Sequence, residues 1–195
     1  MEYNKKNREI VLNRELNKLD KFVIKFVSIL GKYVEYVIIS GYLSILFGRS
    51  RATEDIDFFI KPTTLENFRK LYNELIEKGF WCLNSEEVNE IFSYLNEGLA
   101  VRFSIEGKPI PNCEIKFPKS KLDEETFADL IKVILFKREL NISSLERQIA
   151  FKKYYLKSDK DIEDAIYIEE LFKEKLDHNK INIIKNHIEN DHEKE

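Results

Sequence analysis

Two aspartates separated by one residue, Asp55 and Asp57, open an apolar segment that continues to Ile60. The segment is rich in β-branched and aromatic residues and is followed by Pro62, so it predicts a strand. Residues two apart on a strand project to the same face, which places the two carboxylates roughly 6–7 Å apart on one side. A divalent cation relieves their repulsion, and magnesium or manganese prefers oxygen ligands of this kind. The pair alone is more often a solvated strand face, but with the Ser40-Gly41 junction upstream and Arg51-Ala52-Thr53 just before it, it predicts a metal site that neutralises phosphate charge and aligns an attacking hydroxyl.

The junction at Ser40-Gly41 supplies a second element of such a site. The preceding segment, Tyr33–Ile39, predicts a strand, and Tyr42–Phe47 predicts a short helix. A glycine between a strand and a helix lets backbone N–H groups approach a phosphate closely. We therefore expect Ser40 and Gly41 to contact phosphates, with the Ser40 hydroxyl as a further donor.

A third carboxylate is expected from a neighbouring strand. Glu114 lies within Asn112–Phe117, between residues typical of a core, and is the first choice as a metal ligand and catalytic residue. Glu106 is the alternative, although it lies beside the turn expected near Gly107–Pro109.

The polar segment before Asp55 carries Arg49, Arg51 and Thr53. Planar guanidinium groups suit phosphate oxygens, so both arginines are candidate nucleotide contacts. Arg51 could equally pair with Glu54 or Asp55 and simply hold the loop. Thr53 either caps the loop, close to the nucleotide, or has no specific role. The sequence leaves these alternatives open.

Further cations lie beyond Pro118. Lys160 is a candidate contact for a triphosphate, and the alternative is the solvated first turn of a helix with Ser158 or Asp159 as its N-cap. Four more cations could form a basic surface for nucleotide or RNA, although charged helix faces are usually only solvated. These four are Arg147, Lys152, Lys153 and Lys157.

Hydrophobic periodicity and chain breakers predict the elements that position these residues. The predicted helices of the first half are Arg8–Leu30, ended by Gly31, then Thr64–Lys78, capped by Thr63 or Thr64, and Ser85–Leu95. A hairpin is predicted from Leu99–Ile105 and Ile110–Phe117.

The character of the chain changes after Pro118. From Leu122 to Ile188 there is no glycine or proline, and helical patterns run almost without a break. We therefore predict a mixed core with an N-terminal helix over residues 1–118, followed by a helical C-terminal subdomain over residues 119–195.

Composition excludes several classes of protein. No apolar run is long enough to span a membrane, and the polar N-terminus carries no secretory signal. Two cysteines and three histidines are too few for a disulfide framework or a zinc enzyme. A net charge of −3 disfavours a protein that coats nucleic acid. We expect a cytoplasmic protein with no membrane partner.

The segment Val37–Ile60 resembles the DNA polymerase beta-like nucleotidyltransferase superfamily, in which a hydrophobic strand, Gly-Gly or Gly-Ser, and a spacer precede acid-hydrophobic-acid. The closer resemblance is to the minimal or toxin-type (abortive-infection AbiEii-like) branches, where Gly-x-x-Arg-x-Thr precedes Asp-x-Asp, as in Gly48–Asp57. Lys160–Ala165 is similar to their downstream Lys-Asp-x-x-Asp helix. Two residues depart from the pattern: Ser40 stands at the usual first glycine, and Glu114 at the more common aspartate.

The resemblance implies an α+β fold, a mixed sheet flanked by helices, followed by a helical C-terminal portion. It implies magnesium-dependent transfer of a nucleoside monophosphate from an NTP to a hydroxyl acceptor. That acceptor would be an RNA end, especially tRNA, or a side chain of a partner protein in a toxin–antitoxin-like pair. The metal ligands it implies are Asp55, Asp57 and Glu114, and the nucleotide contacts are Ser40, Gly41, Arg49, Arg51, Thr53 and Lys160. The alternative is a non-catalytic binding or regulatory module of the same fold, which Ser40 and Glu114 favour.

Overall fold

A single mixed sheet organises the protein in the computed structural model, which describes residues 1–192. The strand order is β1-β2-β8-β9-β3-β4-β7-β6-β5. The strands are β1 (Glu2–Asn4), β2 (Glu9–Leu12), β3 (Tyr36–Ile39), β4 (Asp55–Ile60), β5 (Phe80–Cys82), β6 (Val101–Ile105), β7 (Asn112–Lys116), β8 (Ile131–Leu135) and β9 (Arg138–Ile142). The α+β class expected from the sequence is confirmed.

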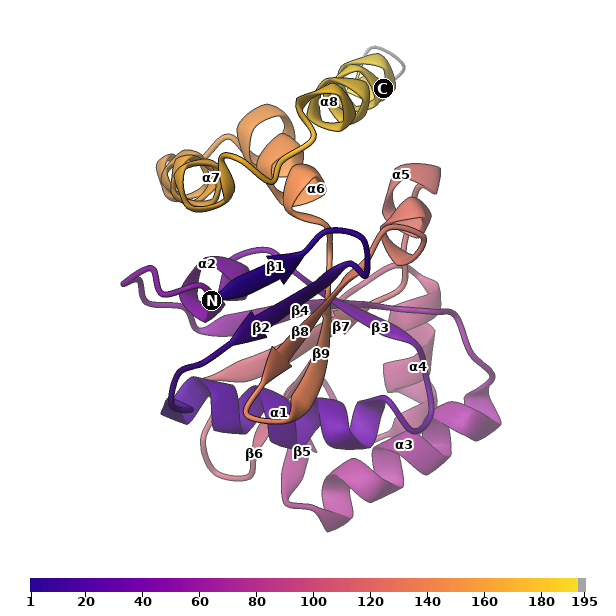
Figure 1. The fold of residues 1–195 in the computed structure, drawn as a ribbon. Coiled ribbons are helices and arrows are strands. Elements are labelled where there is room, and N and C mark those ends of the chain that lie inside the picture. The colour runs from indigo at the N-terminus through magenta and orange to yellow at the C-terminus, as the bar shows by residue number, and fades with distance from the viewer. Residues whose placement is uncertain (193–195) are drawn as a thin grey trace.

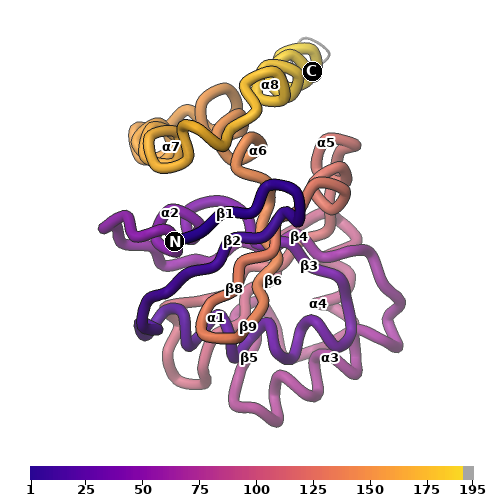
Figure 2. The backbone as a smooth tube through the Cα atoms, in the orientation of Figure 1, coloured from indigo at the N-terminus to yellow at the C-terminus, as the bar shows by residue number. Residues whose placement is uncertain are grey.

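The helices form two groups. The first contains α1 (Lys18–Leu30), α3 (Leu65–Glu77) and α4 (Val88–Asn96), and the second contains α6 (Leu145–Ala150), α7 (Asp159–Phe172) and α8 (His178–His192). The second group lies together at the end of the molecule away from α1 and α3, as both the ribbon and the backbone trace show (Figure 1, Figure 2). Shorter elements are α2 (Tyr42–Leu46), α5 (Lys121–Glu124), a 3-10 turn (Glu125–Phe127) and a π-helical segment (Phe151–Leu156).

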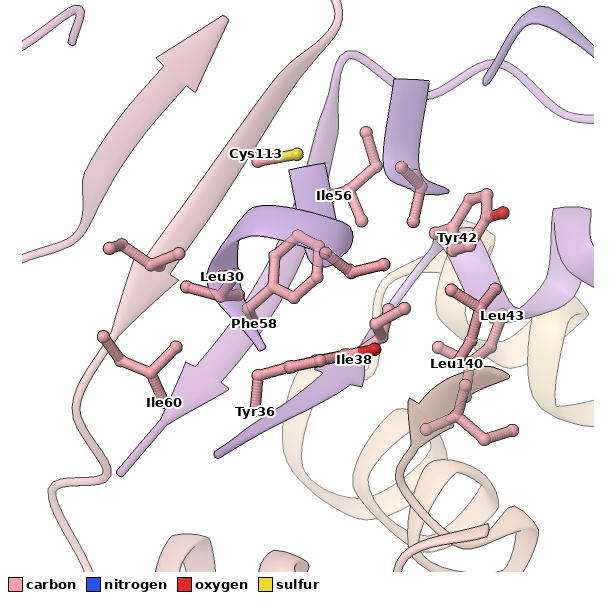
Figure 3. Close-up of a cluster of buried hydrophobic side chains, with 14 of the residues drawn as sticks. Leu30, Tyr36, Ile38, Tyr42, Leu43, Ile56, Phe58, Ile60, Cys113 and Leu140 are labelled. Carbon is pink, nitrogen blue, oxygen red and sulfur yellow. The ribbon is translucent and has the colours of Figure 1, made fainter. Parts of the chain in front are cut away.

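The main core lies between α1 and one face of the sheet. The ring of Phe26 on α1 lies 5.4 Å, centroid to centroid, from Phe58 on β4 and from Phe80 on β5, and 6.1 Å from Phe103 on β6. Figure 3 shows Phe58 in a cluster of buried side chains that includes Leu30 of α1 and Ile60 of β4. Because the apolar side chains of β4 are buried against α1, the alternate residues of β4 point to the opposite face of the sheet.

Helix α1 begins later than the sequence predicted. Asn17 is its N-cap and forms a capping box with Asp20, and Gly31 is its C-cap, as expected. The expected helix from Arg8 is wrong over Glu9–Leu12, which is β2 and pairs in parallel with β8. Four residues of strand can be stable only beside their partners, so the local apolar spacing favoured the wrong element.

The C-terminal portion is not purely helical, contrary to the prediction for the segment after residue 118. Strands β8 and β9 form a hairpin that lies in the sheet between β2 and β3. Both turn residues, Phe136 and Lys137, have positive φ (49° and 62°), as a two-residue hairpin turn requires. Neither is a residue that typically signals such a turn, so the sequence does not predict this hairpin. The division into two domains at residue 118 stays a prediction.

One further expectation for the first half is wrong: the helix predicted from Ser85 begins at Val88 with Glu87 as its N-cap, because the Ser85 hydroxyl accepts from the Glu87 N–H ahead of the helix. Two others are confirmed. Thr64 caps α3 by accepting a hydrogen bond from the Asn67 N–H, and β6 and β7 form the predicted antiparallel pair. Within the described residues, no helix is both long and apolar enough to cross a membrane.

Candidate active site

The predicted carboxylates lie together on one face of the sheet. In the β4–β7 pairing, Asp57 is the direct partner of Glu114, and Asp55 is the direct partner of Asn112. Directly paired residues share a face, so all four side chains project from the same side. The residues between them project to the other side: Ile56, Phe58 and Cys113 are fully buried in the core (Figure 3).

The Ser40 turn reaches the same face. Ile39 is paired with Asp57 across β3 and β4, which brings the next residue, Ser40, beside that aspartate. The Ser40 hydroxyl donates a hydrogen bond to the Asp57 carboxylate. Ser40 adopts a left-handed conformation with φ of 67°, in which glycine is favoured. Glycine at this position would adopt the same conformation at lower cost.

Burial and the neighbouring charges shift the pKa of Asp57. Burial raises the pKa of Asp57 above its ordinary value, Glu114 and Asp55 raise it further by charge repulsion, and Lys116 and the Ser40 hydroxyl oppose the rise. Glu114 and Asp55 therefore act on Asp57 from the same sheet face. A cation beside Asp57 would offset that repulsion.

Glu114 has a competing partner. Arg102 on β6 donates to its carboxylate through Nε at 2.9 Å and places Nη2 at 2.7 Å. Among the described residues, no cluster of three or more His, Cys, Asp or Glu side chains is arranged to hold a metal ion. Magnesium commonly uses only one or two carboxylates together with substrate phosphates, so the chemistry of Asp55 and Asp57 fits this ion. Both Arg102 contacts go to Oε2 of Glu114, so a third ligand from this residue would come from Oε1 or from Oε2 after Arg102 leaves.

A cavity of about 730 Å³ opens beside these acids. Asp57, Glu114 and Ser40 lie in one wall, and residues of α6 and the π-helical segment lie in the opposite wall. This volume lies within the range of about 300–1,000 Å³ typical of small-molecule sites. Further cationic side chains line it, namely Lys116, Lys119, Arg147 and Lys152.

Lys116 and Lys119 were not singled out in the sequence, although Lys116 lies two residues after Glu114 and therefore on its face. Arg147 and Lys152, two of the four cations of the expected basic surface, line the cavity but are buried and paired with acids. Lys153 is also paired, with Glu169 at 2.5 Å.

Comparisons with solved structures agree with this architecture. An antigenic nucleotidyltransferase-like protein from Paracoccidioides brasiliensis matches with a TM-score of 0.51 and 16% identity over 76% of this chain and 72% of that chain. The antibiotic-resistance factor ANT(2'')-Ia in solution matches with a TM-score of 0.55 and 12% identity, over 87% and 92%. Its crystal structure in complex with adenylyl-2''-tobramycin gives 0.53 and 13%, over 89% and 97%. The chain has the nucleotidyltransferase fold. No protein-family model matches the chain, and no curated protein matches it significantly in sequence.

Within this fold, the arginines before β4 contact a buried acid. Arg49 and Arg51 both donate to the carboxylate of Asp164 on α7, and Arg49 also contacts Glu163. Arg51 thus holds its loop, but through Asp164 and not through the expected partners Glu54 or Asp55. The Arg51 guanidinium lies against the Ser40-Gly41 turn: a Cβ atom added at Gly41 would be 2.9 Å from Arg51 Nη1. A contact of either arginine with nucleotide stays a prediction.

Asp164 is the centre of an ion-pair cluster in this nucleotidyltransferase fold. It is fully buried, and Lys152 Nζ lies 2.8 Å from its Oδ2 and 3.0 Å from Asp161 Oδ1. Burial alone would raise the pKa of Asp164, but Lys152, Arg51 and Arg49 outweigh it and lower the pKa below its ordinary value. The acids of the Lys-Asp-x-x-Asp segment therefore tie the loop before β4 to the C-terminal helices.

The remaining predicted contacts are not among the residues that line the cavity. Thr53 donates its hydroxyl to the backbone oxygen of Asp55 at 2.9 Å, which supports a capping role at the start of β4. Ser158 is the N-cap of α7, as expected. Lys160 lies exposed in the first turn of α7, and it is not among the described residues that line the cavity. Its contact with a triphosphate stays a prediction.

Proposed function

We propose that the protein is a metal-dependent nucleotidyltransferase. It would transfer a nucleoside monophosphate from an NTP to an acceptor hydroxyl, forming the new phosphoester bond and releasing pyrophosphate. The observation that carries this proposal is the placement of Asp55 and Asp57 on one sheet face, with Asp57 beside the left-handed Ser40 turn and in the lining of a cavity of nucleotide size.

Each part of the site has a role in this proposal. Asp55 and Asp57 would hold magnesium or manganese, and the bound ion would supply charge neutralisation for the phosphates. Backbone N–H groups at Ser40-Gly41 would bind phosphate oxygens. Glu114 would serve as the third carboxylate, near the attacking hydroxyl, through the oxygen that Arg102 does not contact or after Arg102 moves away. Lys116 would offset phosphate charge from the same face.

The structural neighbours support the reaction class. ANT(2'')-Ia is described in complex with adenylyl-2''-tobramycin, which is an aminoglycoside carrying a transferred adenylyl group. The charges that line the cavity are mixed, with Lys116, Lys119, Arg147 and Lys152 beside Asp57, Glu114 and Asp123, so they do not select a polycationic drug as the acceptor. An RNA end, including that of tRNA, or a side chain of a partner protein in a toxin–antitoxin-like pair is the acceptor we propose, in the cytoplasm.

A non-catalytic module is the second candidate. The Arg102–Glu114 ion pair favours it, because this pair occupies the carboxylate that a catalytic metal would need. Such a module would bind nucleotide through the Ser40 turn without transferring it.

Thermal unfolding with each NTP, with and without magnesium, separates these functions from a fold without a site. An NTP present at 100 times its dissociation constant adds about 2.7 kcal/mol of stability. We expect magnesium-dependent stabilisation that is lost in Asp57→Asn and kept in the control Asp159→Asn, which changes an exposed acid of α7. An identical melting temperature under all conditions would contradict nucleotide binding.

Catalysis itself needs a transfer assay. The wild-type protein is incubated with labelled NTPs, magnesium, total RNA and cell lysate, and label is followed into RNA and protein. We expect label in one acceptor class with wild type and none with Asp55→Asn. Metal-dependent nucleotide binding without any transfer would favour the non-catalytic module.

A further inference from the structure

The side chain of Asn112 donates a hydrogen bond to Asp55, the first aspartate of the pair. Asn112 is the first residue of β7, directly opposite Asp55 on β4. Its side-chain Nδ2 donates to Asp55 Oδ1 at 3.0 Å and lies 3.4 Å from the backbone oxygen of Glu54. Its backbone N–H donates to the same Glu54 oxygen at 2.9 Å. Asn112 thus holds both the backbone and the carboxylate at the start of β4.

The oxygen of the Asn112 side-chain amide has no hydrogen-bond partner among the described residues. Asn112 is only 5% exposed, and its Oδ1 is one of the buried side-chain atoms of the described residues that make no hydrogen bond. Leaving a buried acceptor unsatisfied costs about 1–3 kcal/mol. Rotating the amide by 180° would not help, because its oxygen would then face the Asp55 carboxylate and the Glu54 carbonyl, which are both acceptors.

An apolar β-branched residue would fit this strand position without that cost. The asparagine therefore gives no clear advantage in stability. Apart from the long 3.4 Å contact with the Glu54 oxygen, its side chain contributes the donor that it offers to Asp55. Asp55 is exposed, and among the described residues Asn112 is the side chain that fixes its carboxylate. With Oδ1 held, the second oxygen of Asp55 has a defined direction.

We propose that Asn112 is a positioning residue of the metal site, holding Asp55 in the orientation that a divalent cation requires. This proposal rests on the proposed function, since it assigns Asp55 to a cation. Partners that hold a ligating carboxylate typically change metal affinity by about 10- to 100-fold when they are removed.

The test compares Asn112→Val with Asn112→Thr. The two variants have the same branched shape, and only threonine keeps a hydroxyl that can donate to Asp55. Manganese dissociation constants are measured by electron paramagnetic resonance without nucleotide, and the free energy of unfolding is measured by urea titration. Asn141→Val on β9, in the same sheet but away from the cavity, is the matched control.

We expect Asn112→Val to weaken manganese binding about 10- to 100-fold while its unfolding free energy stays equal to or above that of the wild type. We expect Asn112→Thr to recover part of the affinity and Asn141→Val to bind as the wild type does. Wild-type manganese affinity in a folded Asn112→Val protein would overturn the positioning role but leave the proposed function intact. A wild-type protein that binds no manganese would overturn the proposed metal site together with this inference.

Discussion

Arg102 and Glu114 face each other across β6 and β7, with Arg102 Nη2 2.7 Å from a carboxylate oxygen of Glu114. The side chain of Glu114 is only 12% exposed and that of Arg102 is 47% exposed. The third acid of the candidate site is therefore shielded and neutralised by a residue that can move into solvent. Both Arg102 contacts go to Oε2, so Arg102 offsets the charge that an incoming cation would meet at Glu114.

Replacing Arg102 with alanine should strengthen metal binding, because Glu114 is then free. A partly exposed ion pair contributes about 0.2–1 kcal/mol, so manganese affinity should rise by up to about fivefold. The measurement is manganese titration of Arg102→Ala, Glu114→Gln and the double variant. The gain should vanish in the Glu114→Gln background, and a gain that persists there would show that Arg102 acts by general charge alone.

Two substitutions at Ser40 should separate its backbone from its hydroxyl. Ser40→Ala and Ser40→Gly both lose the hydrogen bond to Asp57, but only alanine keeps the cost of the left-handed conformation. We expect the glycine variant to be more stable than the alanine variant by about 1 kcal/mol in urea unfolding. Equal stability of the two variants would mean that the φ of 67° is not maintained in solution.

Alanine at Gly41 should destabilise the protein through Arg51. The added Cβ atom would lie 2.9 Å from Arg51 Nη1, and Asp164 restrains that guanidinium. Overpacking of this kind costs about 1–3 kcal/mol. In an Arg51→Ala background the cost of Gly41→Ala should fall, as a double-mutant cycle by urea unfolding would show. Gly107→Ala, whose cost comes from its φ of 75°, should be additive with Arg51→Ala.

Asp164→Asn should be one of the most damaging single changes. It removes a buried anion that faces three cations, and breaking a buried pair in this way costs about 3–5 kcal/mol. The neighbouring Glu163, whose side chain is 65% exposed, provides the control. Glu163→Gln should change the unfolding free energy by no more than about 0.5 kcal/mol. Similar losses in both variants would contradict the central role of Asp164.

The same acid should make stability depend on pH in the acid range. The pKa of Asp164 in the folded protein lies below its ordinary value of 3.8. Its contribution is therefore complete above the unfolded-state pKa and is lost as pH falls through the folded-state pKa. Urea unfolding between pH 7 and pH 2 should show a smaller loss of stability below pH 4 in Asp164→Asn than in wild type. Parallel curves would indicate that other acids dominate acid unfolding.

Local rules correctly predicted much of the site. The shared face of Asp55 and Asp57 follows from the two-residue period of a strand, which needs no knowledge of its neighbours. The caps at Gly31, Thr64 and Ser158 were similarly predictable, because capping satisfies backbone groups within a few residues.

Pairing between distant segments was beyond such rules. The sequence marked Glu114 as an acid on a strand, but only the parallel register of β4 and β7 places it beside Asp57. The strands Glu9–Leu12 and Ile131–Leu135 were taken for helix, because each is stable only beside the other in the assembled sheet.

The sequence by itself determined the chemical character of this protein, namely two aspartates in strand register after a glycine turn. Tertiary structure decided which residues hold those groups. Asn112 donates a hydrogen bond to Asp55, Arg102 pairs with Glu114, and Asp164 pairs with Arg51 in the loop before β4. The reason is physical. The direction of a side chain along a strand is set by its own backbone, whereas its hydrogen-bond and ion-pair partners depend on which distant segments pack beside it.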